Sequence, residues 1–147
     1  MKRMGKTGKN NSSKVLNLWL PPFLWAALIF LFSSLQTIKT SEIYWQDFIL
    51  KKTAHILEYG VFATLLYRAL KGSGIERKKA AIYSIVLAVI YGISDEFHQI
   101  FTPGREPKVR DVVFDTIGAS LSSYIILKVL PKSSGNLKKL AERFQLI

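Results

Sequence analysis

Long apolar runs alternate with short polar segments along the chain, and this alternation predicts helices that cross a membrane. The first run covers residues 15–35 and, at about 20 residues, is long enough to cross the hydrocarbon layer of a bilayer. Similar runs follow at residues 54–70, 80–101 and 112–130. We therefore predict an all-α fold, an integral membrane bundle of four transmembrane helices.

The first apolar run has two further features. Pro21 and Pro22 lie near its start and predict a kink or an entry turn. A basic head followed by an apolar run is also typical of a secretory signal peptide. The run is long, however, and no A-x-A cleavage site follows it, so a retained first helix is favoured.

The segments outside the apolar runs define the domain organisation. Residues 1–14 are basic, small and polar, and are predicted as a disordered cytoplasmic tail. Residues 15–131 form the membrane domain, and residues 132–147 form an amphipathic, basic cytoplasmic tail suited to an anionic leaflet. Within residues 36–50, aromatic residues among polar ones predict a short interfacial helix before the second span, with a plain connecting loop as the alternative.

Two short patterns predict local geometry. Residues 102–105 (TPGR) place Pro and Gly where a type II turn requires them. Gly118 and Ser122 continue the helical stripe that begins with Asp111 and Asp115, and both are small enough for close helix packing.

The composition agrees with a membrane protein. The 147 residues are 49% apolar, yet the formal net charge is +11. In a soluble protein such a basic excess would suggest nucleic acid, but with long apolar runs it indicates spans separated by basic loops. We expect the lipid bilayer as a partner and no nucleic acid. The chain has no cysteine, which excludes disulfides and thiolate metal sites.

Lysine and arginine are unevenly distributed between the two ends of the predicted spans. Fifteen of the 21 lie in the N-terminal segment, around the turn after the second span, and near the C-terminus, and the other six lie at the opposite ends. The positive-inside rule then places both termini in the cytoplasm. The polar segment at residues 94–115 is predicted to face the extracytoplasmic side.

Three carboxylates are predicted to lie at one depth in the membrane. At about 1.5 Å per residue, Glu58 lies roughly 18 Å from the end of its span at Leu70, and Asp95 and Asp115 lie roughly 22 Å from the cytoplasmic ends of theirs. Because three separate helices bring an acid to a similar level, we predict that these groups meet. Asp95 and its neighbour Glu96 point about 100° apart, and we favour Asp95 as the inward one.

Three interpretations of this polar cluster are open. The first is a buried ionic network that fixes the helices, with Arg105 paired to one or two of the acids. The second is a divalent-metal or acid–base site, in which His55 with Glu58, and Asp95 with His98, each share a helix face. The third is a pocket for an anionic headgroup, clamped by Arg105, Arg110 and Lys52.

The order of motifs is similar to that of the VanZ-like family. It reads K-x-x-H-x-x-E-Y, then D-E-x-H-Q-x-F-x-P-G-R, then D-x-x-x-D-x-x-G, and covers about residues 16–130. The second motif is the most specific of the three. The residues that carry the resemblance are Lys52, His55, Glu58, Tyr59, Asp95, Glu96, His98, Gln99, Phe101, Pro103, Gly104, Arg105, Asp111, Asp115 and Gly118.

The resemblance implies a role in the bacterial cell envelope, because the family is named after an accessory protein linked to low-level teicoplanin resistance. We expect a multi-pass protein of the bacterial plasma membrane that acts on or binds a lipid-linked or anionic envelope component, and that affects glycopeptide sensitivity. The alternative is a metal-dependent or acid–base hydrolase or transferase acting on lipid phosphate or a cell-wall intermediate, which leaves a divalent metal open as cofactor.

Twelve residues are the candidates for these activities. The candidates for catalysis are His55, Glu58, Asp95, His98, Asp111 and Asp115. The candidates for substrate binding are Lys52, Tyr59, Glu96, Gln99, Arg105 and Arg110.

Overall fold

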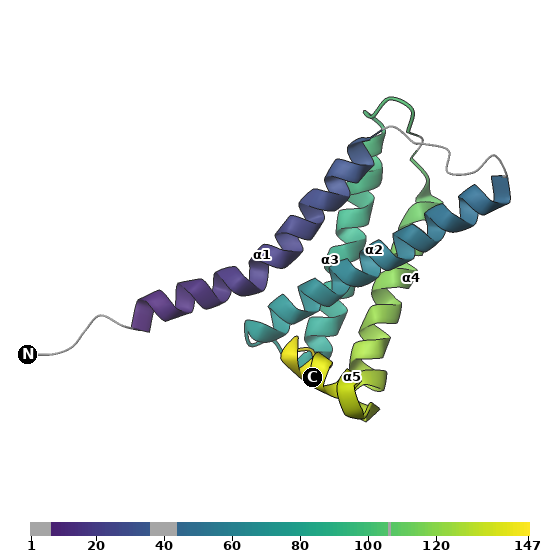
Figure 1. Cartoon of the computed structure of the whole chain (residues 1–147). Coiled ribbons are helices and arrows are strands. Elements are labelled where there is room, and N and C mark those ends of the chain that lie inside the picture. Colours follow the sequence, from purple (N-terminus) through teal and green to yellow (C-terminus); the bar gives the residue numbers. More distant parts are fainter. Residues whose placement is uncertain (1–6, 36–43, 106) are drawn as a thin grey trace, which may run out of the picture.

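The computed structural model describes residues 7–35, 44–105 and 107–147, and within these ranges the chain is helical with no strand. Its α-helices are α1 (Thr7–Ser34), α2 (Tyr44–Gly72), α3 (Arg77–Gln99), α4 (Val109–Tyr124) and α5 (Gly135–Arg143) (Figure 1). A π-helical turn (Ile125–Val129) and a 3₁₀ turn (Leu130–Lys132) continue α4 without a break.

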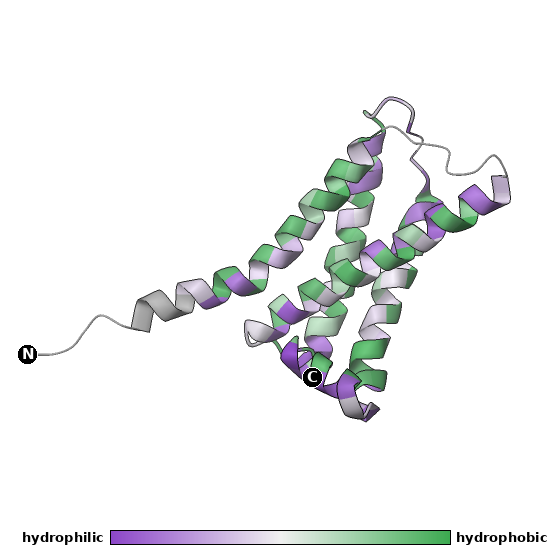
Figure 2. Ribbon diagram, in the orientation of Figure 1, coloured by the Kyte–Doolittle hydropathy of each residue, from purple (hydrophilic) through white to green (hydrophobic). Residues whose placement is uncertain are grey.

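Three helical segments are long and apolar enough to cross a membrane: Ser12–Ser34, Arg77–Gln99 and Val109–Lys132. Figure 2 shows apolar residues along the middle of these helices, whereas α5 and the loop between α3 and α4 are largely hydrophilic. The helix α2 is not among the three, although it is long, because polar side chains such as Lys52 and Glu58 interrupt its apolar sequence. Three of the four predicted spans are therefore supported, and the span at residues 54–70, within α2, remains a prediction.

The first two helices begin earlier than the apolar pattern predicts. The helix α1 begins at Thr7, so residues 7–14 are helical rather than disordered, while residues 1–6 lie outside the described part of the chain. Both Pro21 and Pro22 lie inside α1, which changes direction part-way along its length, in agreement with the predicted kink (Figure 1).

The prediction of a separate interfacial helix is wrong for residues 44–50, because they form the first turns of α2. Neither Gly nor Pro occurs between Tyr44 and Tyr59 to end the helix. An ion pair from Lys51 to Asp47, at 2.7 Å and one helical turn apart, also bridges the predicted junction. Residues 36–43 lie outside the described residues.

The helix α2 is the centre of the bundle and contacts α1, α3 and α4. It approaches α4 closely at Gly118, where an added Cβ atom would overlap the carbonyl oxygen of Ile56. A side chain at this position would therefore separate the two helices. The predicted role of Gly118 in close helix packing is confirmed.

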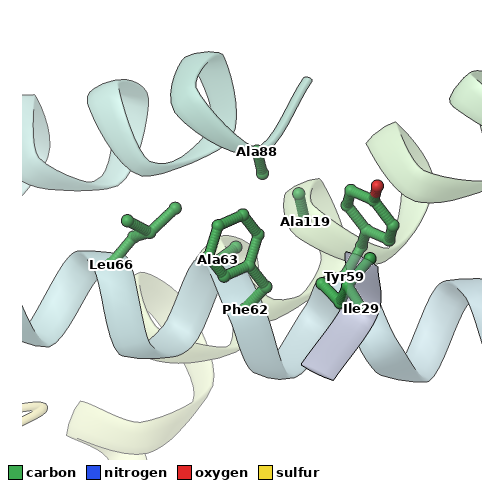
Figure 3. Packing of buried hydrophobic residues seen from close by; sticks show 7 residues of the cluster. All are labelled: Ile29, Tyr59, Phe62, Ala63, Leu66, Ala88 and Ala119. Atoms are coloured by element: carbon green, nitrogen blue, oxygen red, sulfur yellow. The ribbon is translucent and has the colours of Figure 1, made fainter. Parts of the chain in front are cut away.

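Two apolar clusters hold the helices together. In the first, α2 side chains pack against Ala88 of α3 and Ala119 of α4, with Ile29 of α1 beside them (Figure 3). The second lies near the ends of α2 and α4 and includes Ala141 of α5. Both clusters bury apolar side chains between helices. They occupy the second half of α2, so the polar side chains of its first half lie outside them.

The connections place the polar residues at one end of the bundle, which we call the polar end. The ends of α1 and α3 and the starts of α2 and α4 lie there, while α5 and the turn between α2 and α3 lie at the other end (Figure 1). The predicted type II turn agrees with the structure: Gly104 has a φ of 78°, and the Arg105 amide donates to the Thr102 carbonyl at 3.1 Å.

Candidate functional site

Two pairs of charged side chains join α2 to α4 at the polar end. The Nζ atom of Lys52 lies 2.5 Å from Oδ1 of Asp111, and Nδ1 of His55 lies 2.8 Å from Oδ1 of Asp115. Both pairs form because residues three apart on α2 face residues four apart on α4. The second nitrogen of His55, Nε2, is 3.9 Å from Oδ2 of Asp111, so its ring lies between the two acids.

Asp115 is the most deeply placed of these acids, with 2% of its surface exposed. A Cβ atom at Gly92 of α3 would lie 3.2 Å from Oδ2 of Asp115 and 3.5 Å from the Tyr59 hydroxyl. Tyr59 belongs to the first apolar cluster and is buried beside Asp115. Tyr59 therefore lies in the apolar interior and not in the pocket lining, although the sequence predicted it as a substrate-binding residue.

Asp95 and Glu96 of α3 are both buried, although only one was predicted to face inward. Asp95 accepts a hydrogen bond from Nε2 of Gln99 at 2.9 Å. Glu96 accepts one from the backbone amide of Lys108 at 2.6 Å. The burial of Asp95 agrees with the prediction, and Glu96 is buried as well because the chain leading into α4 covers the face of α3 that carries it.

Arg105 does not pair with an acid among the described residues, so its predicted place in the ionic network is wrong. Its Nε atom donates to the Leu35 carbonyl at 2.9 Å, and its Nη2 atom donates to the Phe32 carbonyl at 2.7 Å. The guanidinium thus caps the carbonyl end of α1, where the helix dipole favours a cation. The turn at residues 102–105 directs it towards α1.

His98 also faces α1. Its Nε2 atom lies 3.1 Å from the Ser34 hydroxyl, and its ring centroid lies 4.3 Å from that of Phe30. The prediction that His98 and Asp95 converge on one point is therefore not supported. Together with Arg105, His98 fixes the last turns of α1 against the polar end.

A pocket of about 780 Å³ opens at the polar end. Seven of the predicted residues line it: Lys52, His55, Glu58, Gln99, Arg105, Arg110 and Asp111. The other five predicted residues do not line it: Tyr59, Asp95, Glu96, His98 and Asp115. One wall, from α1 and the residue that follows it, includes Ile29, Phe32 and Leu35, while α2 and the start of α4 supply most of the charged groups.

Several lining residues were not among the predicted site residues, and Phe48 is the most important of them. It was predicted only as an interfacial aromatic, yet the guanidinium carbon of Arg110 lies 4.9 Å from its ring centroid. The Nζ atom of Lys52 is also 5.8 Å from the same centroid. The spacing from Phe48 to Lys52, one helical turn, is the signal that places both on one face of α2.

Two guanidinium groups in the pocket lack a carboxylate partner within the described residues. Arg110 makes its ring contact with Phe48 and no hydrogen bond or ion pair there, and Arg105 binds neutral carbonyl groups. By contrast, Lys51 and Lys52 are each paired with an aspartate. Glu58 lines the same pocket and attracts Arg105 without forming an ion pair, so Arg110 is the less compensated charge and the one more open to an anion.

The donor set suits an anion better than a metal ion. Among the described residues, no three His, Asp or Glu side chains are arranged to hold a metal. The acids of α4 are instead engaged by Lys52 and His55. What the site offers chemically is a pair of arginines and an imidazole oriented by a buried carboxylate.

The family described as VanZ/LLP1 matches residues 3–130, which contain all the residues of the site. No curated protein matches the chain, and no solved structure does.

We predict that the Lys52–Asp111 pair stabilises the bundle, whereas the Lys51–Asp47 pair does not. Lys52→Met leaves the Asp111 carboxylate buried without its cation, which should lower the free energy of unfolding by about 3–5 kcal/mol. Lys51→Met is the matched control on the same helix, and because that pair is more exposed its loss should be less than about 1 kcal/mol. Unfolding of the purified variants in detergent measures both.

A second variant tests the physical reason. Adding Asp111→Asn to Lys52→Met removes the unpaired charge and should recover a large part of the lost stability. Equal losses in the two lysine variants would contradict a buried ion pair at Lys52.

Proposed function

This chain belongs to the VanZ/LLP1 family, and on that premise we propose that it binds the anionic headgroup of a lipid-linked cell-envelope component. The proposal places it in the bacterial plasma membrane as a four-span protein with both termini in the cytoplasm. The observation that carries it is the pair of arginines, Arg105 and Arg110, which face the pocket without a carboxylate partner among the described residues.

The form of the pocket supports a lipid as the ligand. Its volume of about 780 Å³ lies within the range of small-ligand sites. The wall from α1 is largely apolar, and Phe32 and Leu35 are exposed on it. An amphiphile would place its charged group against Arg110 and its chain along α1. Binding of this kind to an envelope component is also how we propose that the protein affects sensitivity to glycopeptides such as teicoplanin.

In the proposed topology α2 also crosses the membrane, which brings the number of spans to four, and the pocket faces outward. The polar groups that lower the hydropathy of α2, including Lys52 and His55, pair with α4, so they are compatible with a span inside a bundle. The fifteen lysines and arginines attributed above to the cytoplasmic side lie at or near the N-terminus, the turn after α2 and the C-terminus. The pocket is then extracytoplasmic.

A second candidate function is favoured by the His55–Asp115 pair. Asp115 is buried and engages Nδ1 of His55, while the same ring lines the pocket. This arrangement leaves Nε2 to accept a proton from a water whose oxygen attacks the phosphorus of a lipid phosphate ester. The bond from phosphorus to the leaving alcohol breaks, and the imidazole returns the proton to that alcohol. The reaction class is hydrolysis, or transfer where another alcohol replaces water.

Arg110→Gln should weaken binding of an anionic lipid without unfolding the protein. Arg110 is exposed and makes no hydrogen bond to the described residues, so its loss should leave thermal stability unchanged. Loss of a charge-assisted hydrogen bond should raise the dissociation constant by about 10-fold or more. The measurement is binding of polyprenyl phosphate and of phosphatidic acid to detergent-solubilised protein by native mass spectrometry, with phosphatidylcholine as the neutral probe.

The matched control for that experiment is Lys78→Gln, an exposed cation at the opposite end of the bundle and outside α5. Its affinity for both anionic lipids should equal that of the original chain. Equal weakening by the two variants would mean that net charge alone attracts the lipid, and the headgroup pocket would have to be abandoned.

The two histidines separate the catalytic candidate from the binding one. His55→Gln should abolish release of phosphate or headgroup from the lipids that bind, because it removes the only imidazole in the pocket lining. His98→Gln is the control, since His98 contacts Ser34 and lies outside the lining. Turnover that survives His55→Gln refutes acid–base catalysis by this residue and leaves the binding function standing.

The proposed orientation predicts the activity of reporter fusions. A reporter that is active only outside the cytoplasm should be inactive when fused after Ile147 and active when fused after Glu106. The reverse pattern would move the pocket to the cytoplasmic face.

A further inference from the structure

The C-terminal helix α5 has an apolar stripe that the bundle covers only in part. Residues 137, 140, 141 and 144 recur at the three- and four-residue spacing of one helix face. Of these, Ala141 is buried in the second apolar cluster. Leu137, Leu140 and Phe144 are 51%, 50% and 54% exposed. The protein therefore leaves a row of three large apolar side chains uncovered within its described residues.

The opposite face of α5 is basic. Lys138, Lys139 and Arg143 are exposed, and the only acid within α5 is Glu142. Lys128 and Lys132, which precede the helix at the end of the α4 segment, are exposed as well. A helix with an apolar face and a basic face is suited to the boundary between the acyl chains and the headgroups of an anionic leaflet.

The position of α5 is fixed relative to the helices that are long enough to cross a membrane. The Tyr67 hydroxyl donates to the Leu146 carbonyl at 3.2 Å, and Nζ of Lys71 donates to the Gln145 carbonyl at 3.3 Å. Leu146 and Ile147 also pack against the second apolar cluster. Because both ends of this short segment are attached to the bundle, α5 presents a defined surface.

The level of α5 agrees with the edge of the hydrocarbon layer. The candidate span Val109–Lys132 ends two residues before Ser134, after which α5 begins at Gly135. The helix lies at the end of the bundle that also carries the turn between α2 and α3 (Figure 1). Its uncovered apolar row therefore lies where a spanning helix leaves the lipid, and its lysines lie at headgroup level.

We propose that α5 is a binding surface for anionic lipids, docked on the leaflet at the end of the bundle opposite the pocket. Leu137, Leu140 and Phe144 enter the acyl layer, and Lys138, Lys139 and Arg143 contact the headgroups. The charge of the helix selects this occupant, since a neutral leaflet or an apolar protein surface gains nothing from three lysine and arginine side chains. The proposal is independent of what the pocket binds.

The absence of cysteine from the chain makes a site-specific test direct. Leu140→Cys introduces one labelling site on the apolar row, and Glu142→Cys introduces the matched control on the polar face. Each full-length variant carries an environment-sensitive fluorophore and is reconstituted in vesicles of phosphatidylcholine alone or with phosphatidylglycerol. Brominated acyl chains quench a label in the acyl layer, and aqueous iodide quenches one in water.

The label at position 140 should be quenched by brominated lipid in the vesicles with phosphatidylglycerol, and far less in phosphatidylcholine alone. Replacing Lys138, Lys139 and Arg143 together with Gln should lower the equilibrium constant for docking by about 100-fold, since each basic residue near an anionic surface contributes about fivefold. High salt should weaken docking of the original chain in the same direction. The label at position 142 should remain accessible to iodide throughout.

Three results would overturn the proposal. Iodide access at position 140 equal to that at position 142 in both vesicles would mean that α5 remains in water. Lipid quenching that is unaffected by phosphatidylglycerol and by the triple substitution would mean that apolar burial alone holds the helix. Efficient disulfide cross-linking of two unlabelled chains through the cysteine at position 140, and not through the one at position 142, would mean that a second copy of the chain covers the row.

Discussion

The structure depends on neutralising two carboxylates that α4 carries into the bundle. An ionised aspartate inside an apolar assembly is costly unless a cation or hydrogen-bond donors reach it. Lys52 and His55 of α2 supply those partners, at 2.5 Å from Asp111 and 2.8 Å from Asp115. The pairing fixes the register of α2 against α4. It is geometrically feasible because, one turn further along α4, Gly118 allows the two backbones to come close.

The same pairing determines the character of the pocket. Since Lys52 and His55 engage the acids of α4, those acids cannot also neutralise Arg105 and Arg110. Arg105 is held by the carbonyl end of α1, and Arg110 by the face of an aromatic ring. Neither contact removes a positive charge, and Glu58, which also lines the pocket, offsets only part of the total. The pocket is therefore electropositive as a consequence of how the helices are fixed, and this is the property that the proposed lipid-headgroup function uses.

Much of the fold follows from local sequence, whereas the partners of the site residues do not. Apolar periodicity locates the helices, and residues 102–105 specify their turn, because both depend on neighbours in the chain. Helical spacing also predicts the face of α3 on which His98 lies, but it does not predict which helix packs against that face. His98 contacts α1 and not the acids of the site. The burial of Glu96 likewise requires a loop from twelve residues further along the chain. Spacing predicts which side chains share a face, and only the tertiary structure shows what that face meets.

A purely scaffolding role explains one part of the polar end and leaves another part unexplained. The four groups that join α2 and α4 satisfy one another, and a structural network needs no more. Oδ1 of Asp95 is nevertheless buried without a hydrogen-bond partner among the described residues, and Arg110 is stacked on a ring beside an open pocket. Polar groups of this kind are costly near lipid and add nothing to the pairing of α2 with α4. Arg110 lines a pocket of about 780 Å³, a position that suits a ligand site and that the pairing of α2 with α4 does not require.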